Sequence, residues 1–337
     1  MYAKNSYRRT PRRKLQDYFH KLRHLYKPWH KKRRRCLPKF YILGFPKCGT
    51  TDLYITLKKH PKIADDIPAK EPAFWNRHNF AREPITRQIL SKCSFSSYVD
   101  LYDLAAFKTR HNRKQIIVDA SVSYIWDYGD WPNIPLNKGL DEPSIITAHF
   151  IRHFTPGAKF IILVREPSER IYSQYLYVKK GGESKFNFHA AVVEGIDLMQ
   201  RCMKERSQRD CLYDPTFNRT ITVWLQINHY VTFIQDWLSV FPREQFYFLR
   251  LEDYMVNKTK AIIKISRFLG TGELSKSYVK YLNSTNQFVE NARSAEDMKI
   301  GDMLPETKLL LHKYFDPWNK RLAALLNDSS FIYQYRS

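Results

Sequence analysis

Short, continuous runs of apolar residues recur along the chain, and each is typical of a strand buried on both faces of a parallel sheet. Four runs have this pattern: Phe40–Phe45, Gln115–Asp119, Lys159–Val164 and Gln245–Leu251. All of them are too short for a well-formed helix and carry many β-branched or aromatic residues. We therefore predict a strand at each of the four positions.

Longer stretches with helical periodicity separate these runs. One follows Thr51 as far as Lys59, and the others cover Phe95–Ala106, Pro143–Phe154, Pro167–Lys179, Phe186–Met203, Ile221–Phe241, Asp253–Leu269 and Pro305–Leu326. Strands that alternate with helices predict a mainly parallel sheet with helices on both faces, an α/β three-layer sandwich. No internal repeat or linker interrupts the pattern, so we predict one domain over residues 40–335.

Positive charge is concentrated at the beginning of the chain. The net charge is +23 over 337 residues. Residues 1–39 hold fifteen Lys and Arg but one acid, Asp17, and account for +14 of that charge. This composition predicts a disordered basic arm ahead of the domain. The remainder is still basic, which favours polyanionic partners such as nucleic acid, anionic lipid or acidic polysaccharide.

Signals for the cellular compartment are mixed. No run of about 18 apolar residues predicts a membrane span, and no secretory apolar segment follows Met1. Four glycosylation sequons nevertheless favour a lumenal protein; they begin at Asn218, Asn257, Asn283 and Asn327. Among five cysteines, Cys202 and Cys211 have the spacing of a short-loop disulfide. Two free thiols are the alternative for that pair.

A phosphate-binding loop follows the first predicted strand. The sequence from Gly44 to Thr51 nearly matches the P-loop pattern, with Thr50 where a nucleotide triphosphatase has its lysine. The loop lysine lies earlier, at Lys47. Backbone N–H groups at the following helix start, with two threonine hydroxyls, form an anion site by geometry. A P-loop-like site without that lysine fits a phosphosulfate, whose terminal group carries one negative charge. An ordinary strand-to-helix turn is the alternative.

A second anion site is predicted beside the third strand. Arg165 directly follows a buried strand, at the sheet edge where ligands of open α/β sheets bind. Ser173 lies two helical turns further on, so both side chains are expected to reach one phosphate. For Arg165 alone, a surface salt bridge is the alternative.

These segments resemble the Golgi carbohydrate sulfotransferases. Within that family they are most similar to the N-acetylgalactosamine 4-sulfate 6-O-sulfotransferases, which act on chondroitin and dermatan sulfate. The similar stretches are Phe45–Leu53, Val164–Tyr177, Asp236–Arg243, Leu249–Tyr254 and Asn319–Leu326. The likeness spans about residues 40–333. Residues 1–39 lie outside it.

The resemblance implies a reaction and a set of binding residues. The sulfuryl donor would be 3′-phosphoadenylyl sulfate (PAPS), the acceptor a glycan hydroxyl, and neither a metal nor nucleic acid would be needed. Lys47 would stabilise the bridging oxygen as its bond breaks. The 5′-phosphosulfate would be held by Lys47, Cys48, Gly49, Thr50 and Thr51, and the 3′-phosphate by Arg165 and Ser173. Golgi residence and a membrane anchor are also implied, although this chain shows no anchor.

A candidate catalytic base follows the phosphate loop by about twenty residues. In related heparan sulfate sulfotransferases a glutamate within Lys-Glu-x-His-Phe-Phe removes the acceptor proton. Here Glu71 matches that glutamate, and Ala73 stands where the histidine is usual. A sugar hydroxyl needs such a group, since it is a poor nucleophile until its proton is accepted. The neighbouring Lys70 would favour the ionised carboxylate. A surface Glu–Lys pair is the alternative.

The acceptor side of the site is predicted less specifically. Ser121 follows a buried strand as a possible ligand contact, or as the cap of a helix start. Trp126, Tyr128 and Trp131 would form a sugar-stacking wall or pack in the core. Adenine contacts are placed between Asn291 and Gly301 by a loose match to the family. Two isolated histidines, His189 and His229, give no metal constellation.

Two other functions compete with a sulfotransferase. A P-loop kinase or nucleotide triphosphatase would need a lysine at position 50 and a magnesium-binding acid. A non-catalytic polyanion-binding protein on the same fold is suggested by the basic arm and by Ala73.

Overall fold

The computed structural model describes residues 35–64, 67, 69–78, 95–111, 115–179, 184–285 and 295–334. Nearly all of the predicted basic arm, residues 1–34, lies outside this range. Within the described residues, no helix is both long enough and apolar enough to cross a membrane.

A parallel sheet forms the centre of the molecule. Its strands are β1 (Phe40–Gly44), β2 (Val118–Asp119), β3 (Lys159–Val164) and β4 (Phe246–Arg250). Their order is β2-β1-β3-β4, and every neighbouring pair is parallel. The central strands β1 and β3 are almost entirely buried, as their apolar sequences require.

All four predicted strands are present, but the second is shorter than expected. Only Val118 and Asp119 pair with β1. Ile116 instead forms an isolated bridge with Ile63, which follows the first helix. The apolar run therefore extends beyond the sheet, where it pairs with the segment that contains Ile63.

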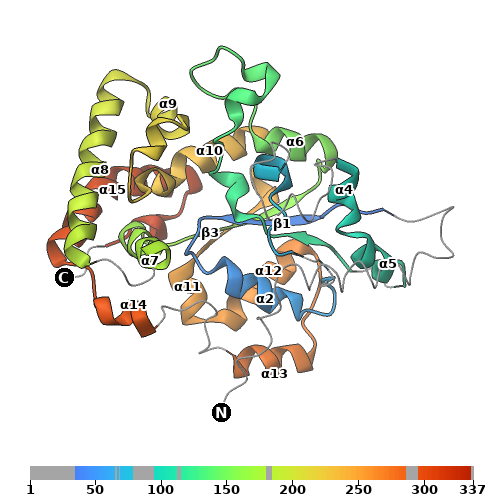
Figure 1. The fold of residues 1–337 in the computed structure, drawn as a ribbon. Helices are drawn as coiled ribbons and strands as arrows, with labels where there is room; N and C mark the ends of the chain where they lie inside the picture. Colours follow the sequence, from blue (N-terminus) through green and yellow to red (C-terminus); the bar gives the residue numbers. More distant parts are fainter. Residues whose placement is uncertain are drawn as a thin grey trace.

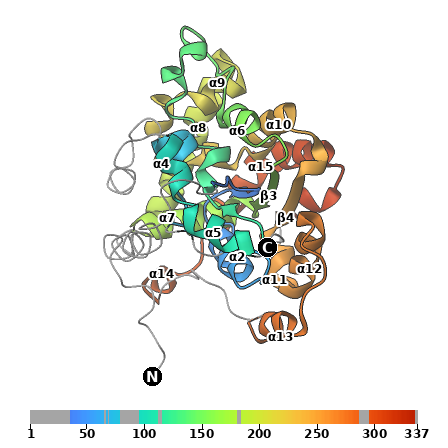
Figure 2. The same ribbon diagram turned by 90° about the vertical axis from the view of Figure 1, so that its right-hand side faces the viewer.

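Helices cover both faces of the sheet. Figure 1 shows α6 (Thr147–Phe154) and α10 (Tyr230–Val240) on one side, and α2 (Thr50–Lys58) and α12 (Lys258–Leu269) on the other. The same separation is visible after a quarter turn in Figure 2. The predicted α/β three-layer architecture is thus confirmed.

Further α-helices surround this centre. They are α4 (Phe95–Asp100), α5 (Asp103–His111), α7 (Pro167–Lys179), α8 (Lys185–Glu205), α9 (Gln208–Tyr213), α11 (Leu251–Val256), α13 (Lys276–Ser284), α14 (Ala295–Ile300) and α15 (Pro305–Leu326). Of these, α7 and α15 have the predicted bounds, and both begin with the proline that favours a first helical turn.

Capping residues and one left-handed residue account for several differences from the predicted helices. The stretch Asp253–Leu269 divides into α11 and α12 because the Asn257 side chain accepts a hydrogen bond from the Lys260 N–H and starts a new helix. The predicted Ile221–Phe241 helix begins only at Tyr230, since Trp224 has φ 45° and a 3₁₀ turn follows it. The unpredicted helices α9 and α13 start at capping serines, Ser207 and Ser275.

A buried ion pair fixes α2, the helix that follows the phosphate loop. Nζ of Lys258 lies 3.0 Å from Oδ2 of Asp52, and both side chains are almost fully buried. The hydroxyl of Tyr254 donates to the same carboxylate at 2.7 Å. A buried carboxylate is tolerated only with such partners, so this cluster ties the start of α2 to α11 and α12.

Candidate functional site

A large pocket opens where the parallel strands end. Its volume is about 970 Å³, at the upper end of the range typical of small-ligand sites. Among its lining residues are Lys47, Gly49, Thr50, Thr51, Lys70, Glu71, Arg165 and Ser173. The structure therefore brings together most of the predicted site residues, which the sequence separates by more than a hundred positions.

The phosphate loop has the backbone of an anion cradle. Lys47 has φ 67°, and Gly49, the N-cap of α2, has φ 80°. Another residue at Gly49 would be strained by the left-handed φ, and its Cβ atom would also lie 2.6 Å from Cδ1 of Leu251, which would have to shift. Thr50 and Thr51 form the first turn of α2, where backbone N–H groups are free to bind an anion. Cys48 instead points inward and is fully buried.

Lys47 lies on the pocket side of this loop. Its ammonium is 4.2 Å from the centroid of the Tyr177 ring. Burial, with a smaller contribution from the Arg165 charge, lowers the pKa of Lys47, while Asp297 acts in the opposite direction. A bound anion would relieve this unfavourable environment, because it would add negative charge beside the buried cation.

Arg165 and Ser173 complete the predicted donor side. Arg165 follows β3, and its Nη1 donates to the carbonyl oxygen of Lys47 at 3.3 Å. Its Nη2 also contacts Glu169, in the first turn of α7, at 3.4 Å. Ser173 lies on the same helix and reaches the pocket although only 7% of its surface is exposed. The two predicted 3′-phosphate contacts thus line the same pocket as the phosphate loop.

Arg170 is a supporting residue that the sequence analysis did not single out. Its side chain is fully buried. It donates to the carbonyl oxygens of Pro46 and Trp224, at 3.4 Å each, and its Nε contacts Asn228. Arg170 therefore fixes the phosphate loop relative to the segment that contains Trp224. Its place in the Arg-Glu-Pro-Ser-Glu-Arg stretch was the signal that could have identified it.

Glu71, the candidate base, is linked to the phosphate loop through Lys70. Nζ of Lys70 lies 2.7 Å from Oε1 of Glu71 and donates to Oγ1 of Thr51 at 3.1 Å. The pair lines the pocket and is only partly buried, so its Coulombic contribution to stability is small. Its geometric effect is to hold a carboxylate beside the predicted phosphosulfate cradle.

Ser121 has a different role from the predicted substrate contact. Its side chain is fully buried and does not line the pocket. Its Oγ accepts a hydrogen bond of 2.9 Å from the backbone N–H of Ala73, a residue with φ 51°. This contact holds the segment that carries Glu71 in a backbone conformation that alanine rarely adopts.

The buried carboxylate of Asp119 also supports the segment that carries Glu71. The hydroxyl of Tyr124 accepts from the Phe74 N–H at 3.0 Å and donates to Asp119 at 3.1 Å. Tyr98 donates to the same Asp119 oxygen at 2.8 Å. Burial raises the pKa of Asp119, and these hydrogen bonds oppose the shift. The network passes from the end of β2 to Phe74 in the segment that carries the candidate base, and the sequence alone did not predict it.

The predicted aromatic residues divide between the pocket and the core. Trp126 and Tyr128 line the pocket. Trp131 does not, because its side chain is buried and its Nε1 donates to the carbonyl oxygen of Tyr213 at 2.8 Å. Tyr128 stacks on Tyr213, with ring centroids 4.9 Å apart. We call the lining residues contributed by segments 122–129 and 212–227 the aromatic wall.

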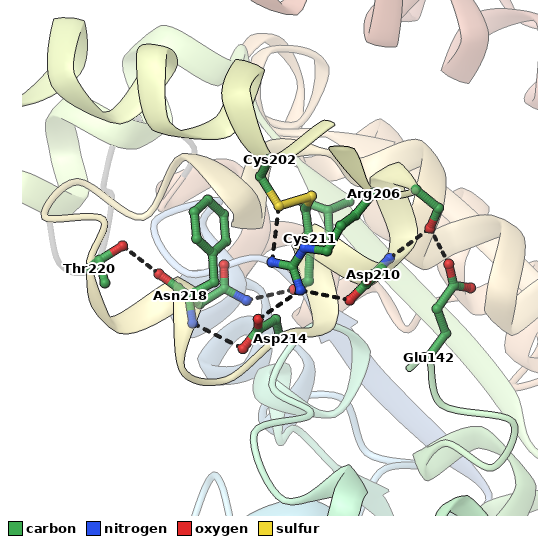
Figure 3. The surroundings of a disulfide bond; sticks show 11 residues. Glu142, Cys202, Arg206, Asp210, Cys211, Asp214, Asn218 and Thr220 are labelled. Carbon is green, nitrogen blue, oxygen red and sulfur yellow. Dashed lines mark hydrogen bonds and ion pairs between the residues drawn. A yellow bond between two sulfur atoms is a disulfide. The ribbon is translucent and has the colours of Figure 1, made fainter. Parts of the chain in front are cut away.

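A disulfide joins Cys202 and Cys211, which settles the alternative left by their spacing. Figure 3 shows Arg206 between this bond and two carboxylates, with Nη1 at 3.1 Å from Asp210 and 3.0 Å from Asp214. The disulfide therefore closes the turn between α8 and α9, directly ahead of the pocket-lining segment.

The first sequon lies in the pocket wall. Nδ2 of Asn218, the atom that would carry a glycan, donates to the carbonyl oxygen of Leu212 at 2.7 Å. This position argues against glycosylation of Asn218 in the folded chain. The other sequon asparagines, Asn257, Asn283 and Asn327, are exposed.

The predicted adenine segment is described only in part. Asn291 and Arg293 lie outside the described residues, while α14 and Gly301 lie within them. The Gly301 carbonyl accepts from the Tyr172 hydroxyl at 2.8 Å, which places this segment beside α7. In the described part of the chain, no cluster of three His, Cys, Asp or Glu residues could hold a metal. His189 contacts Thr307, and His229 contacts Gln208 and Tyr314.

Comparison with known proteins gives a consistent family assignment. The family model described as "Sulfotransferase domain" matches residues 37–299. Carbohydrate sulfotransferase 15 from Mus musculus is 38% identical over 314 residues, which cover 90% of this chain and 55% of that protein. The Homo sapiens protein of the same name gives the same values. The chain thus spans about half the length of these curated relatives.

More distant similarity supports the same fold. Bifunctional heparan sulfate N-deacetylase/N-sulfotransferase 3 from Homo sapiens is 24% identical over 243 residues, which cover 69% of this chain and 22% of that protein. A solved sulfotransferase from Alicyclobacillus acidocaldarius matches with a TM-score of 0.56 at 22% identity, over 88% of this chain and 99% of that chain.

Proposed function

The chain belongs to the sulfotransferase domain family, and from this premise we propose that it transfers the sulfuryl group of PAPS to a carbohydrate hydroxyl. By resemblance, the acceptor is an N-acetylgalactosamine residue of chondroitin or dermatan sulfate, and the protein works in the Golgi lumen. The observation that carries the proposal is the shared pocket, in which the Lys47 loop, Arg165 and Glu71 meet.

The donor side is proposed to bind two separate anionic groups. The phosphate loop, with Lys47, Gly49, Thr50 and Thr51, would hold the 5′-phosphosulfate at the start of α2. Arg165 and Ser173 would hold the 3′-phosphate. Two cationic centres beside each other fit a nucleotide with two anionic arms, and the 3′ contact would distinguish PAPS from adenylyl sulfate.

Glu71 is proposed to accept the proton of the attacking hydroxyl. The sulfur forms a bond to the sugar oxygen while its bond to the 5′-phosphate oxygen breaks, and the sugar proton moves to the Glu71 carboxylate. Lys47 would stabilise the charge that grows on the departing phosphate oxygen. Products are a sulfate ester and adenosine 3′,5′-bisphosphate. Holding the acceptor in line with the sulfur supplies part of the acceleration.

Lys70 is proposed to link the donor-binding loop to the catalytic base. Because it contacts both Thr51 and Glu71, it connects the phosphate cradle to the base. The same contacts would place the carboxylate on the acceptor side of the phosphosulfate. This arrangement supports catalysis with Ala73 in place of the usual histidine, since Lys70 and the Ser121 contact hold the segment.

The test is transfer of labelled sulfate from PAPS to chondroitin sulfate by the purified chain. We expect transfer by the wild type and a loss of at least about a hundredfold in kcat for Lys47→Ala. The control is Lys59→Ala, an exposed lysine just beyond α2, which should retain full activity.

Three results would contradict the proposal. Binding of PAPS and glycan without transfer would select the non-catalytic polyanion-binding alternative. Thermal stabilisation by ATP with magnesium, but not by PAPS, would select a nucleotide triphosphatase. Equal activity of Lys47→Ala and Lys59→Ala would remove Lys47 from the mechanism.

A further inference from the structure

The aromatic wall contains polar groups that the described structure leaves unused. Ser123 and Gln226 both line the pocket and are at least nine-tenths buried. Oγ of Ser123 and Oε1 of Gln226 have no hydrogen-bond partner among the described residues. Burying such atoms unpaired is costly, so their presence beside aromatic rings points to a polar ligand that packs against this wall.

Arg219 is the cation of this wall. Its side chain is exposed and lines the pocket. In the part of the chain that the structure describes, no ion pair or hydrogen bond involves its guanidinium group. Two other arginines nearby already form ion pairs, since Arg206 and Arg209 each contact two carboxylates. A guanidinium left for solvent in a pocket wall is a suitable partner for a carboxylate or sulfate.

The backbone that carries Arg219 is held firmly. Oδ1 of Asp214 accepts from the N–H groups of Thr216 and Phe217, at 2.8 and 2.9 Å. Arg206 binds the other oxygen of Asp214 and packs against the Phe217 ring at 5.8 Å. Asn218 is fixed by its bond to the Leu212 carbonyl. The disulfide between α8 and α9 completes this support, which Figure 3 shows as one connected cluster.

We infer that Arg219 binds an anionic group of the acceptor glycan, a sulfate ester or a uronate carboxylate, on a sugar that packs against the aromatic wall. This inference rests on the proposed function and adds the substrate contact that sets acceptor preference. Asp127 is the acid of the same wall, and its Oδ1 accepts from the Gly129 N–H at 3.5 Å. Removing Arg219 therefore takes a positive charge from a wall that also contains an acid.

The experiment compares Arg219→Gln with wild type on three acceptors: chondroitin sulfate, chemically desulfated chondroitin, and carboxyl-reduced chondroitin sulfate. We expect KM for chondroitin sulfate to rise about tenfold to a hundredfold, with KM for PAPS unchanged. If the sulfate is the partner, the KM for desulfated chondroitin should be the same in Arg219→Gln as in the wild type. If the carboxylate is the partner, the carboxyl-reduced acceptor is the insensitive one.

Two further variants complete the design. Arg201→Gln removes an exposed α8 arginine outside the pocket and should leave every acceptor KM unchanged. Arg219→Lys retains the charge without the planar fork and should give an intermediate KM. An unchanged KM in Arg219→Gln, or an equal rise on all three acceptors, would overturn the inference. Failure of the wild type to transfer to any acceptor would instead overturn the proposed function.

Discussion

Nη1 of Arg165 donates a hydrogen bond of 3.3 Å to the carbonyl oxygen of Lys47. The proposed 3′-phosphate contact therefore also positions the backbone of the proposed phosphosulfate contact. Lys47 has φ 67°, a conformation that needs support from its surroundings. The two proposed anion sites are thus coupled, and a change at Arg165 should affect binding of both the 5′ and the 3′ group of the donor.

We predict that Arg165→Gln raises KM for PAPS by about tenfold or more, because a charge-assisted contact to the 3′-phosphate is lost. Affinity for adenylyl sulfate should fall less, since that nucleotide lacks the 3′-phosphate. With both donors kcat should also fall, by a smaller factor than the rise in KM for PAPS, because the Lys47 carbonyl loses its hydrogen bond. Initial rates with each donor measure these effects, with Arg201→Gln as the matched control. Equal losses of affinity for both nucleotides would refute the 3′-phosphate assignment.

The second prediction concerns the base. Glu71→Gln should lower kcat by about 10²–10⁴-fold while binding of adenosine 3′,5′-bisphosphate stays unchanged, because the amide keeps the shape but accepts no proton. Calorimetric titration of the nucleotide and steady-state rates separate the two effects. Glu194→Gln is the control, since that carboxylate is exposed on α8 and lies outside the pocket lining. If kcat for Glu71→Gln matches the wild type, another group is the base.

The sequence predicted those features that depend on local pattern. Buried strands such as Lys159–Val164 are continuous apolar runs, and helices such as α7 begin with a marked proline. The phosphate loop was predicted from the same kind of pattern, because Gly49 and the threonines occupy fixed places between a strand and a helix. Parallel connectivity then brought Lys47 and Arg165 to one edge of the sheet.

Features that depend on tertiary packing could not be predicted from local sequence patterns. For Ser121 and Trp131 the sequence left a ligand contact and a structural role open. In the structure Ser121 holds the Ala73 backbone, and Trp131 donates to a carbonyl of α9. Arg219 was hidden inside a glycosylation sequon, and its place in the pocket wall depends on the supports around the disulfide. Residue type alone does not distinguish a buried supporting group from one that faces a pocket.

The third prediction is that Asn218 carries no glycan in the native protein. Its Nδ2 is hydrogen-bonded and its side chain lies in the pocket wall, so a glycan there would block the pocket. Mass spectrometry of peptides from protein secreted by mammalian cells measures the occupancy of each sequon. The exposed Asn257, Asn283 and Asn327 serve as internal comparisons. A glycan found on Asn218 of active protein would contradict both this prediction and the assignment of the aromatic wall.

The final prediction is a loss of stability in acid that originates in a buried histidine. His229 is fully buried, and burial lowers its pKa to about 3. Nδ1 lies 3.0 Å from Nε2 of Gln208, and Nε2 lies 3.2 Å from the Tyr314 hydroxyl. These partners favour a neutral ring that accepts at Nδ1 and donates at Nε2. Protonation would remove the acceptor and place an unpaired charge in the core.

Because the folded state resists this proton while the unfolded state binds it near pH 6.5, the contribution of His229 is complete above that pH and is lost as the pH falls towards 3. The free energy of unfolding should therefore decrease by about 1.4 kcal/mol per pH unit below the unfolded pKa for this group. Urea unfolding between about pH 7 and about pH 5 measures the slope. His229→Gln should flatten it, whereas the exposed His153→Gln should not. His60, whose pKa burial lowers to about 4, leaves a residual slope in the His229 variant. An identical slope in wild type and His229→Gln would mean that the ring is already solvated or charged.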